Sequence, residues 1–519
     1  MPTPEPIIIG VADIINRTVR PIEPLDLISN AIINALRDTG LSAAYLDQLR
    51  QSVDDLSIVK SWTWPYDDFA KLLAEKAGVP NAHRKESDHG GNQPVKCLDE
   101  ACRLLMDGER KVAVLAGGEA LDSLTRAAKS KHLSKLPWTK TSTAIDNVFS
   151  PTTRPLAPSY GARHRIGAPI QIYPLFENGF RAHRKQSIRG NHEESAQLYA
   201  DFEQVAAENP YAWNYARRKG KHGIMTVGEG NRMVCWPYPL LMNAFNNVNL
   251  AAAVIVTTTD TARALGVHED RWIYVRGAAG TSESADFWNR SDFRSSPAIS
   301  RSLDTALASA GLEAKDIDFH DFYSCFPIVP KLACQHLGLL FSNRPKPITV
   351  LGGLTSFGGA GNNYSMHALT ESVRQLRLPS DKRARHALVL ANGGVLTYQH
   401  VAILSTQPRE DTKRYTDYSR LPPHLDLSAP EIAEQAEGNA VIETFTADFD
   451  KKGKPALGHI VGRLEDGRRF LANHGDERTL RELVSWDVEA VGRKGIVRYD
   501  AKEGRNLFVF ERWKGLGKL

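Results

Sequence analysis

Two motifs between Asp316 and Leu376 decide the fold. Residues 317–326 read Ile-Asp-Phe-His-Asp-Phe-Tyr-Ser-Cys-Phe, and residues 351–364 read Leu-Gly-Gly-Leu-Thr-Ser-Phe-Gly-Gly-Ala-Gly-Asn-Asn-Tyr. The first motif predicts a short strand that delivers His320 and Asp321 into a loop. The second predicts a glycine-rich turn that leads into a helix, because four apolar residues after it are spaced for one helix face. They are Met366, Leu369, Val373 and Leu376.

The density of glycines in the second motif indicates positive φ angles or a backbone that another group approaches closely. The helix behind it offers unpaired N–H groups to an anion or an oxyanion. Each feature has a simpler interpretation when taken alone. A glycine-rich loop is more often a tight turn than a ligand cradle, and a single histidine such as His320 is more often a hydrogen-bonded structural residue.

Taken in order, the two motifs resemble the second half of a thiolase, closest to the sterol-carrier type. In that family the first motif supplies a histidine that helps bind a thioester carbonyl oxygen, and the resemblance assigns this role to His320. The second motif normally continues as Gly-His-Pro, whose histidine activates the nucleophile. Here the same positions read Gly358-Gly359-Ala360, so that histidine is missing.

A related pattern occurs earlier in the chain, which predicts two α/β halves related by duplication. The corresponding segments are Gly90-Gly91-Asn92 and Gly361-Asn362-Asn363, then strands Val112–Leu115 and Ala387–Leu390, then Gly117-Gly118 and Gly393-Gly394. Strand Asp54–Lys60 corresponds in the same way to Asp316–His320. The resemblance implies the five-layer αβαβα thiolase architecture, with one half in residues 1–248 and the other in residues 249–405.

Residues 120–248 are too long and irregular for a simple loop, and we expect a small subdomain there. Thiolases have a loop domain at this place that binds coenzyme A. The resemblance therefore implies that Arg184, Lys185 and Arg218 contact the phosphates of a coenzyme A thioester, which would be a substrate or ligand. On charge pattern alone, a solvated basic face is an equally good interpretation. We expect no other bound cofactor.

The C-terminal part of the chain has a different sequence pattern. Residues 406–429 are polar, contain Pro422-Pro423 and predict a linker. In residues 430–519, strand-like segments alternate with turns, which predicts a small β-barrel of the oligonucleotide/oligosaccharide-binding type. The segments are Val441–Phe449, Leu457–Leu464, Arg468–Ala472, Trp486–Val491, Gly495–Tyr499 and Asn506–Phe510. Thiolase-like proteins of type 1 carry such an additional domain, and the chain resembles them throughout its length.

The catalytic cysteines of thiolases are absent from this sequence. The nucleophile stands at a helix N-terminus, where the helix dipole and a histidine lower the pKa of its thiol. The corresponding position here is at or near Gly91, and the site of the second cysteine reads Ala391-Asn392-Gly393-Gly394. Cys97 and Cys102 lie inside the following helix and are expected to pack as small apolar residues. Ordinary ping-pong acetyl transfer is therefore not expected.

What remains is an oxyanion-like pocket and two tyrosines. The pocket glycines are Gly91, Gly353, Gly359 and Gly393. Certain thiolase-related steroid side-chain aldolases also lack the cysteine, and they place a tyrosine in each segment that here contains Tyr323 and Tyr364. A phenol can transfer a proton when its neighbours lower its pKa from about 10. That both tyrosines are packing residues is an equally weighted alternative.

The composition sets further limits. The chain has 519 residues, 42% hydrophobic and 24% charged, as expected of a soluble protein with two or three domains. Its five cysteines are odd in number and lack metal-binding spacing, which favours a reducing cytoplasm and no metal site. A net charge of +5 is too small to indicate nucleic acid, and no apolar run is long enough for a membrane span.

Three functions remain open. The first is an enzyme related to acetyl-CoA acetyltransferases that acts on thioesters without a cysteine, by carbon–carbon cleavage, condensation or hydrolysis. The second is a non-catalytic acyl-CoA or lipid-binding protein on a thiolase scaffold. The third is a partner-binding protein whose C-terminal barrel recruits another acyl-CoA enzyme. Either a monomer or a thiolase-like homodimer is compatible with the sequence.

Overall fold

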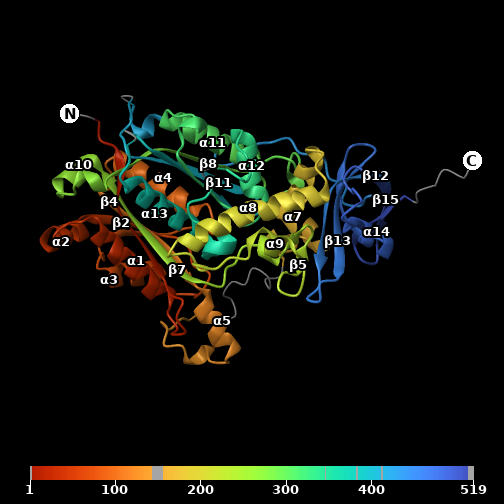
Figure 1. Cartoon of the computed structure of the whole chain (residues 1–519), viewed down its shortest axis with the longest axis horizontal. Coiled ribbons are helices and arrows are strands. Elements are labelled where there is room, and N and C mark those ends of the chain that lie inside the picture. Colours follow the sequence, from red (N-terminus) through yellow and green to blue (C-terminus); the bar gives the residue numbers. More distant parts are fainter. Residues whose placement is uncertain (1–2, 143–155, 345–346, 382–383, 411–412, 512–519) are drawn as a thin grey trace, which may run out of the picture.

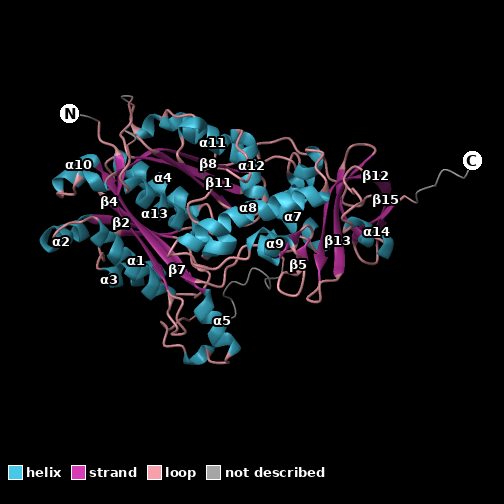
Figure 2. Ribbon diagram, viewed as in Figure 1, coloured by secondary structure: helices cyan, strands magenta, loops and turns pink. Residues whose placement is uncertain are grey.

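A nine-stranded sheet forms the centre of the molecule (Figures 1 and 2). The structure is a computed structural model that describes residues 3–142, 156–344, 347–381, 384–410 and 413–511. The strand order is β3-β2-β4-β7-β1-β8-β11-β10-β9. The strands are β1 (Pro6–Ile15), β2 (Val53–Ile58), β3 (His83–Glu86), β4 (Val112–Ala120), β7 (Asn249–Thr258), β8 (Ile273–Ser282), β9 (Phe319–Phe322), β10 (His386–Gly393) and β11 (Tyr398–Ser405).

The two halves of this sheet have the same strand order and the same strand directions. From the middle outward, β1, β7, β4 and β2 correspond to β8, β11, β10 and β9. The outermost of these pairs, β2 with β4 and β9 with β10, are parallel, and the others are antiparallel. Strands β1 and β8 pair antiparallel with each other and join the halves. This symmetry confirms the predicted duplication.

Six helices complete five layers. Helices α1 (Pro24–Asp38) and α3 (Phe69–Ala77) cover the first half-sheet, and α11 (Pro297–Ala310) and α12 (Ile328–Leu337) cover the second. Between the half-sheets, α4 (Gln93–Met106) packs against α13 (Tyr364–Arg377). The two inner helices are buried on nearly every side, because each has a sheet on both flanks. The predicted αβαβα architecture is therefore confirmed.

The region between β4 and β7 contributes mainly helices. Apart from short 3₁₀ turns, they are α5 (Leu121–Lys129), α6 (Tyr160–Arg163), α7 (Pro169–His183), α8 (Ile188–Glu208) and α9 (Gly220–Met225), followed by strands β5 (Met233–Cys235) and β6 (Tyr238–Pro239). The two remaining helices of the core are α2 (Ala43–Ser52) and α10 (Thr259–Ala264). A buried cation fixes α7 and α8 to α12: the Lys331 ammonium donates to Glu177 Oε1 (2.7 Å), Asn191 Oδ1 (2.9 Å) and Ser195 Oγ (2.8 Å).

The C-terminal strands close into a barrel. They are β12 (Gly438–Phe449), β13 (Pro455–Leu464), β14 (Arg469–His474), β15 (Lys494–Asp500) and β16 (Arg505–Phe510), and β12 pairs with both β13 and β15. Strand β16 lies between β14 and β15, the Greek-key connection of the predicted barrel type. The strand predicted at Trp486–Val491 is wrong, because the chain forms helix α14 (Glu477–Leu483) and then an irregular segment.

Two parts of the chain that were expected to be separate pack closely. Strand β5 pairs with the end of β12, so the sheet of the barrel extends into the region between the core strands (Figure 1). The predicted linker is also anchored. Tyr415 is buried and donates a hydrogen bond to Asp99 Oδ1 of α4 (2.9 Å). None of the helices in the described part of the chain has the length and apolar character of a membrane span.

Arg469 of β14 joins the barrel to the core. Its side chain is fully buried and forms a two-pronged contact with Glu443 of β12 (2.9 and 2.6 Å). The same guanidinium donates to the carbonyl oxygens of Trp288 (2.8 Å), Arg290 and Ser291 (3.2 Å) in the core. A buried guanidinium needs such full pairing, since an unpaired charge in the interior is costly.

Replacing Arg469 by Met should therefore lower the free energy of unfolding by about 3 kcal/mol, because three core carbonyl groups lose their buried donor and Glu443 is left with Arg463 as its partner. Urea unfolding followed by tryptophan fluorescence measures the change. The matched control is Arg468→Met, which removes a neighbouring guanidinium that is exposed and pairs only with Asp466. Equal effects of the two substitutions would contradict a structural role for Arg469.

Candidate active site

The hydroxyl of Tyr323 fills the space next to Gly91, the residue at the predicted nucleophile position. A Cβ atom built on Gly91 would lie 2.4 Å from Tyr323 Oη and 2.4 Å from the carbonyl oxygen of Asn392. Such distances are far below van der Waals contact, so a cysteine at position 91 would require both groups to move. The thiolase nucleophile is thus absent from the sequence, and its place is occupied by a phenol.

Tyr364, the first residue of α13, lies beside Tyr323. The two ring centroids are 5.4 Å apart at an angle of 82°, and Phe357 packs against the other side of Tyr364 at 6.0 Å. Tyr323 is 7% exposed and Tyr364 is 0% exposed. Burial raises the pKa of both phenols. Both hydroxyls are therefore protonated at neutral pH, and the lowered phenol pKa that was expected to permit proton transfer is found at neither tyrosine.

Asp321 is the carboxyl group of this site. Its Oδ2 accepts hydrogen bonds from Thr349 Oγ1 (2.8 Å), the Val350 amide (3.0 Å) and the Leu351 amide (3.2 Å). Burial raises its pKa to about 6, and the hydrogen bonds, including an interaction with the Tyr364 hydroxyl, oppose this rise. Asp321 therefore changes its charge close to neutral pH, next to one of the two phenols.

His320 lies on the other face of its strand. Successive residues of a strand alternate between its faces, and Asp321 shares the face of Tyr364. His320 is on the opposite face of β9 with Phe322, its ring centroid 5.3 Å from that ring. The strand alternation therefore argues against a place for His320 on the face that carries Asp321 and Tyr364. Its role toward a substrate stays a prediction that this geometry does not favour.

The four predicted pocket glycines do not form one cradle. Gly393 lies against Gly91, with its Cβ position 3.0 Å from the Gly91 nitrogen. Gly353, at φ 75°, packs against Ser324 and Phe202. The Gly359 amide donates to the carbonyl oxygen of Phe245 (2.7 Å). Gly359 has one backbone N–H, and the Phe245 carbonyl oxygen already accepts from it. The expectation that Gly359 binds an oxyanion is therefore wrong.

A chain of side-chain hydrogen bonds lies beside Gly91, and the sequence did not predict it. Asn392 Nδ2 donates to Tyr173 Oη (2.8 Å), Gln399 Nε2 donates to Asn392 Oδ1 (2.8 Å), and Tyr173 Oη donates to the Gly394 carbonyl oxygen (3.1 Å). These bonds hold the turn that presents the Asn392 carbonyl to Gly91. Tyr173 belongs to α7, far from either motif in sequence, and no local pattern marks it.

The three basic residues predicted to bind coenzyme A lie in different surroundings. Arg184 forms a bidentate pair with Glu194 (2.9 and 3.0 Å) and stacks 4.6 Å from the Phe341 ring, so its charge is already neutralised. Lys185 is exposed and lines an open cleft of about 900 Å³ between α7 and the barrel.

Arg218 belongs to an exposed basic turn that packs on the second motif. The amides of Trp213 and Asn214 donate to the carbonyl oxygens of Phe357 (2.7 Å) and Ser356 (3.2 Å). Arg217 is exposed as well. The pKa of Arg17 is lowered by its own partial burial and by the nearby charge of Arg217. The neighbouring positive charges make the potential at this turn positive, which favours an anionic ligand.

The thiols offer no alternative nucleophile in the folded protein. All five cysteines are unpaired and buried. Burial raises the pKa of Cys97, Cys325 and Cys334 to about 12 in each case. Within the described residues, no group of three His, Cys, Asp or Glu side chains is placed to hold a metal ion.

Two family models match the C-terminal half of the chain. The thiolase C-terminal domain-like model matches residues 345–406, and the thiolase-like protein type 1 additional C-terminal domain matches residues 421–502. The crystal structure of a monomeric SCP2-thiolase like protein type 1 from Mycobacterium smegmatis matches 98% of this chain and 99% of its own, with 29% identity and a TM-score of 0.79. The chain is similar to this thiolase-like protein of type 1 over nearly its whole length and matches the additional C-terminal domain of that type.

A second solved structure, an Ltp2-ChsH2(DUF35) aldolase, matches 77% of this thiolase-like chain and 98% of its own. Its identity is 18% and its TM-score 0.57, which shows a shared fold. A comparison with curated protein sequences finds no match. The family predicted from the two motifs and the C-terminal strands is thus confirmed.

Iodoacetamide should leave the folded protein unlabelled at neutral pH, because its thiols are buried and protonated. Intact mass measurement after incubation with the reagent checks this. The control is the same reaction in urea, where all five cysteines should react. Rapid labelling of one cysteine in the native state would show a reactive thiol that the structure does not contain.

The raised pKa of Asp321 has a measurable effect on stability. A carboxyl whose pKa is higher in the folded state loses stabilising free energy as pH rises from its unfolded value, 3.8, through about 6. Asp321→Asn cannot lose a proton, so its stability relative to the parent should improve by about 1 kcal/mol as pH rises from about 5 to about 7.5. Urea unfolding at the two pH values measures this. A pH-independent difference would contradict the raised pKa.

Proposed function

We propose that this thiolase-like protein acts on an acyl-CoA thioester by proton transfer at tyrosines, in a carbon–carbon cleavage or condensation of aldol type. The observation that carries the proposal is the Tyr323 hydroxyl in the place of a nucleophilic cysteine, with Tyr364 perpendicular to it and Asp321 behind Tyr364. No cysteine stands at the thiolase nucleophile position, and all five thiols are buried, which disfavours an acyl-enzyme. A pair of phenols with one carboxylate is sufficient for acid–base chemistry.

The two phenols have different neighbours, which suggests different roles. In a cleavage, the β-hydroxyl of the thioester loses its proton as the carbon–carbon bond breaks, and the bonding electrons form an enolate of the thioester. Tyr364 would accept that proton while passing its own to the Asp321 carboxylate. Tyr323, which does not adjoin the carboxylate, would protonate the enolate carbon. Condensation is the same sequence in reverse.

The basic turn supports a coenzyme A thioester as the ligand. Arg217 and Arg218 are exposed, and their turn is bonded to the segment that precedes Tyr364. A phosphate-bearing ligand bound there would lie close to the segment that precedes Tyr364. Guanidinium groups match phosphate oxygens in two-pronged contacts. We accordingly assign coenzyme A phosphates to this turn and not to Arg184.

The burial of the two tyrosines favours a second candidate function, a non-catalytic acyl-CoA-binding protein. With Tyr323 7% exposed and Tyr364 0% exposed, a substrate reaches the hydroxyls only after a covering segment moves. A non-catalytic acyl-CoA-binding protein would need no such movement. Partner recruitment through the barrel is the third alternative, although β12 and β14 already contact the core. We expect a monomer, because the Mycobacterium smegmatis relative is monomeric, and a cytoplasmic location.

If the protein is an enzyme, Tyr323→Phe and Tyr364→Phe should each lower kcat on β-hydroxyacyl-CoA thioesters by on the order of 10²-fold, the usual contribution of a proton-transfer group. The rate should also fall below pH 6 and lose this dependence in Asp321→Asn. Release of the cleaved carbonyl product is measured by mass spectrometry. Tyr45→Phe, an exposed tyrosine of α2, is the matched control.

Calorimetric titration with coenzyme A separates the alternatives. If coenzyme A binds but none of the β-hydroxyacyl-CoA thioesters is converted, the protein is a binding protein and not an enzyme. Turnover that survives both tyrosine substitutions would contradict the tyrosine mechanism. Trapping of an acyl group on the protein would contradict both functions.

A further inference from the structure

We propose that the junction between α8 and the barrel is a binding site for a neutral, flat, apolar ring compound. The junction contains an open pocket of about 490 Å³, within the size range of small-molecule sites. On one side lie α8, the segment after α9, and β5; on the other lie the end of β12, the β12–β13 turn and the segment after α14. Figure 1 shows α9 and β5 beside the barrel.

Most of the residues that line this pocket are apolar, and several carry aromatic rings. The apolar ones are Met225, Val227, Met233, Trp236, Phe449, Val484 and Trp486. The Trp236 and Trp486 centroids are 4.4 Å apart at 59°, and Phe449 lies nearly parallel to Trp236 (17°) at 6.5 Å. A flat ring can pack against such rings by offset stacking or edge contacts, and methionine sulfur adapts to its outline.

Part of this apolar surface faces solvent. Val227 is 43% exposed, and Phe449, Val484 and Trp486 are partly exposed. Apolar side chains gathered around a concavity gain free energy when a ligand removes them from water. This cluster of apolar side chains forms only in the folded chain, since Val227 and Trp486 are far apart in the sequence.

The polar groups at the pocket favour a ligand without net charge. Arg189 forms a bidentate pair with Asp487 (2.9 and 3.0 Å), and Glu193 accepts from the Lys221 ammonium (2.7 Å). His192 bonds the Met225 carbonyl oxygen through Nε2 (2.8 Å), and burial lowers its pKa, so the ring is neutral at pH 7. A charged ligand would lose its hydration without gaining an unpaired counter-ion.

Two related fluorescent probes test this site on the full-length protein. N-phenyl-1-naphthylamine is neutral, whereas 1-anilinonaphthalene-8-sulfonate is its anionic sulfonate. The neutral probe should bind with one site per chain and quench tryptophan fluorescence by energy transfer, and it should bind at least tenfold more tightly than the sulfonate. Comparable or tighter binding of the sulfonate would overturn the proposal.

Substitutions in the pocket test whether the neutral probe binds there. Trp486→Ala and Val227→Asp should each weaken the neutral probe at least tenfold, and Val227 is exposed enough for aspartate to leave the fold intact. Leu340→Ala, an apolar residue 70% exposed and outside the pocket, should leave binding unchanged. Circular dichroism verifies folding. Full binding by the folded Val227→Asp protein, or sedimentation showing the pocket covered by a second copy, would overturn the proposal.

Discussion

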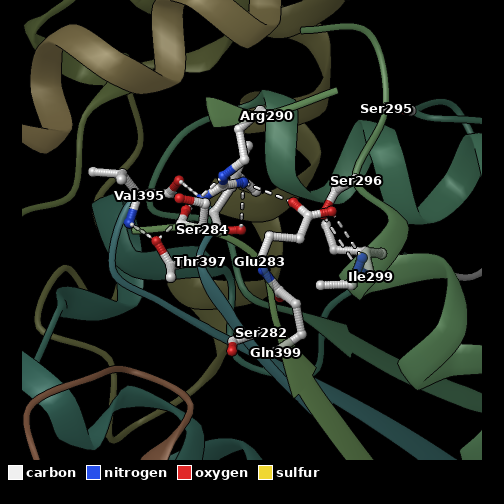
Figure 3. A network of polar contacts seen from close by, with 12 residues as sticks. Ser282, Glu283, Ser284, Arg290, Ser295, Ser296, Ile299, Val395, Thr397 and Gln399 are labelled. Atoms are coloured by element: carbon white, nitrogen blue, oxygen red, sulfur yellow. Dashed lines mark hydrogen bonds and ion pairs between the residues drawn. The ribbon is translucent and has the colours of Figure 1, made fainter. Parts of the chain in front are cut away.

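The pairing of Arg469 with Glu443 inside the molecule is the constraint on which the arrangement of the domains depends. It places a fully buried charge of the barrel against the core carbonyl groups of residues 288–291. The same core segment carries Arg290, which binds Glu283 (2.7 Å) and the carbonyl oxygens of Val395 (3.1 Å) and Leu396 (3.2 Å). Figure 3 shows Arg290 between Glu283 on one side and Val395 and Thr397 on the other.

Through these arginines the barrel is connected to the candidate site. The turn held by Arg290 follows directly after Gly393 and Gly394, and Gly393 lies against Gly91. Tyr173 fixes the same turn from α7 by accepting the Leu396 amide (3.3 Å). Buried charges and amides are tolerated here because each has a partner, and full pairing makes the geometry specific. The additional domain is therefore part of the structure that holds the site.

The duplication explains why the site forms where it does. Helices α4 and α13 occupy equivalent places in the central layer, so the loops before them meet. The Gly90 amide donates to Asn362 Oδ1 (3.0 Å), and Ser365 Oγ donates to the Gly91 carbonyl oxygen (3.1 Å). At this meeting point a thiolase uses a cysteine, whereas here the available volume is taken by Tyr323. A thiol can accept an acyl group, whereas a phenol is suited to proton transfer, which is the basis of the function proposed above.

Local sequence signals were sufficient for the fold class, the duplication and the barrel, because each element carries its own apolar periodicity and turn residues. The resemblance to thiolases, and no local signal, directed attention to Gly91, Tyr323 and Tyr364, whose roles stay predictions. Tertiary packing was needed to establish that Asp321 and not His320 shares the face of Tyr364, since a strand's two faces look alike until its neighbours are in place. The partners of Arg184 and Gly359, and the contribution of Tyr173, likewise come from segments distant in sequence, whose contacts exist only after packing.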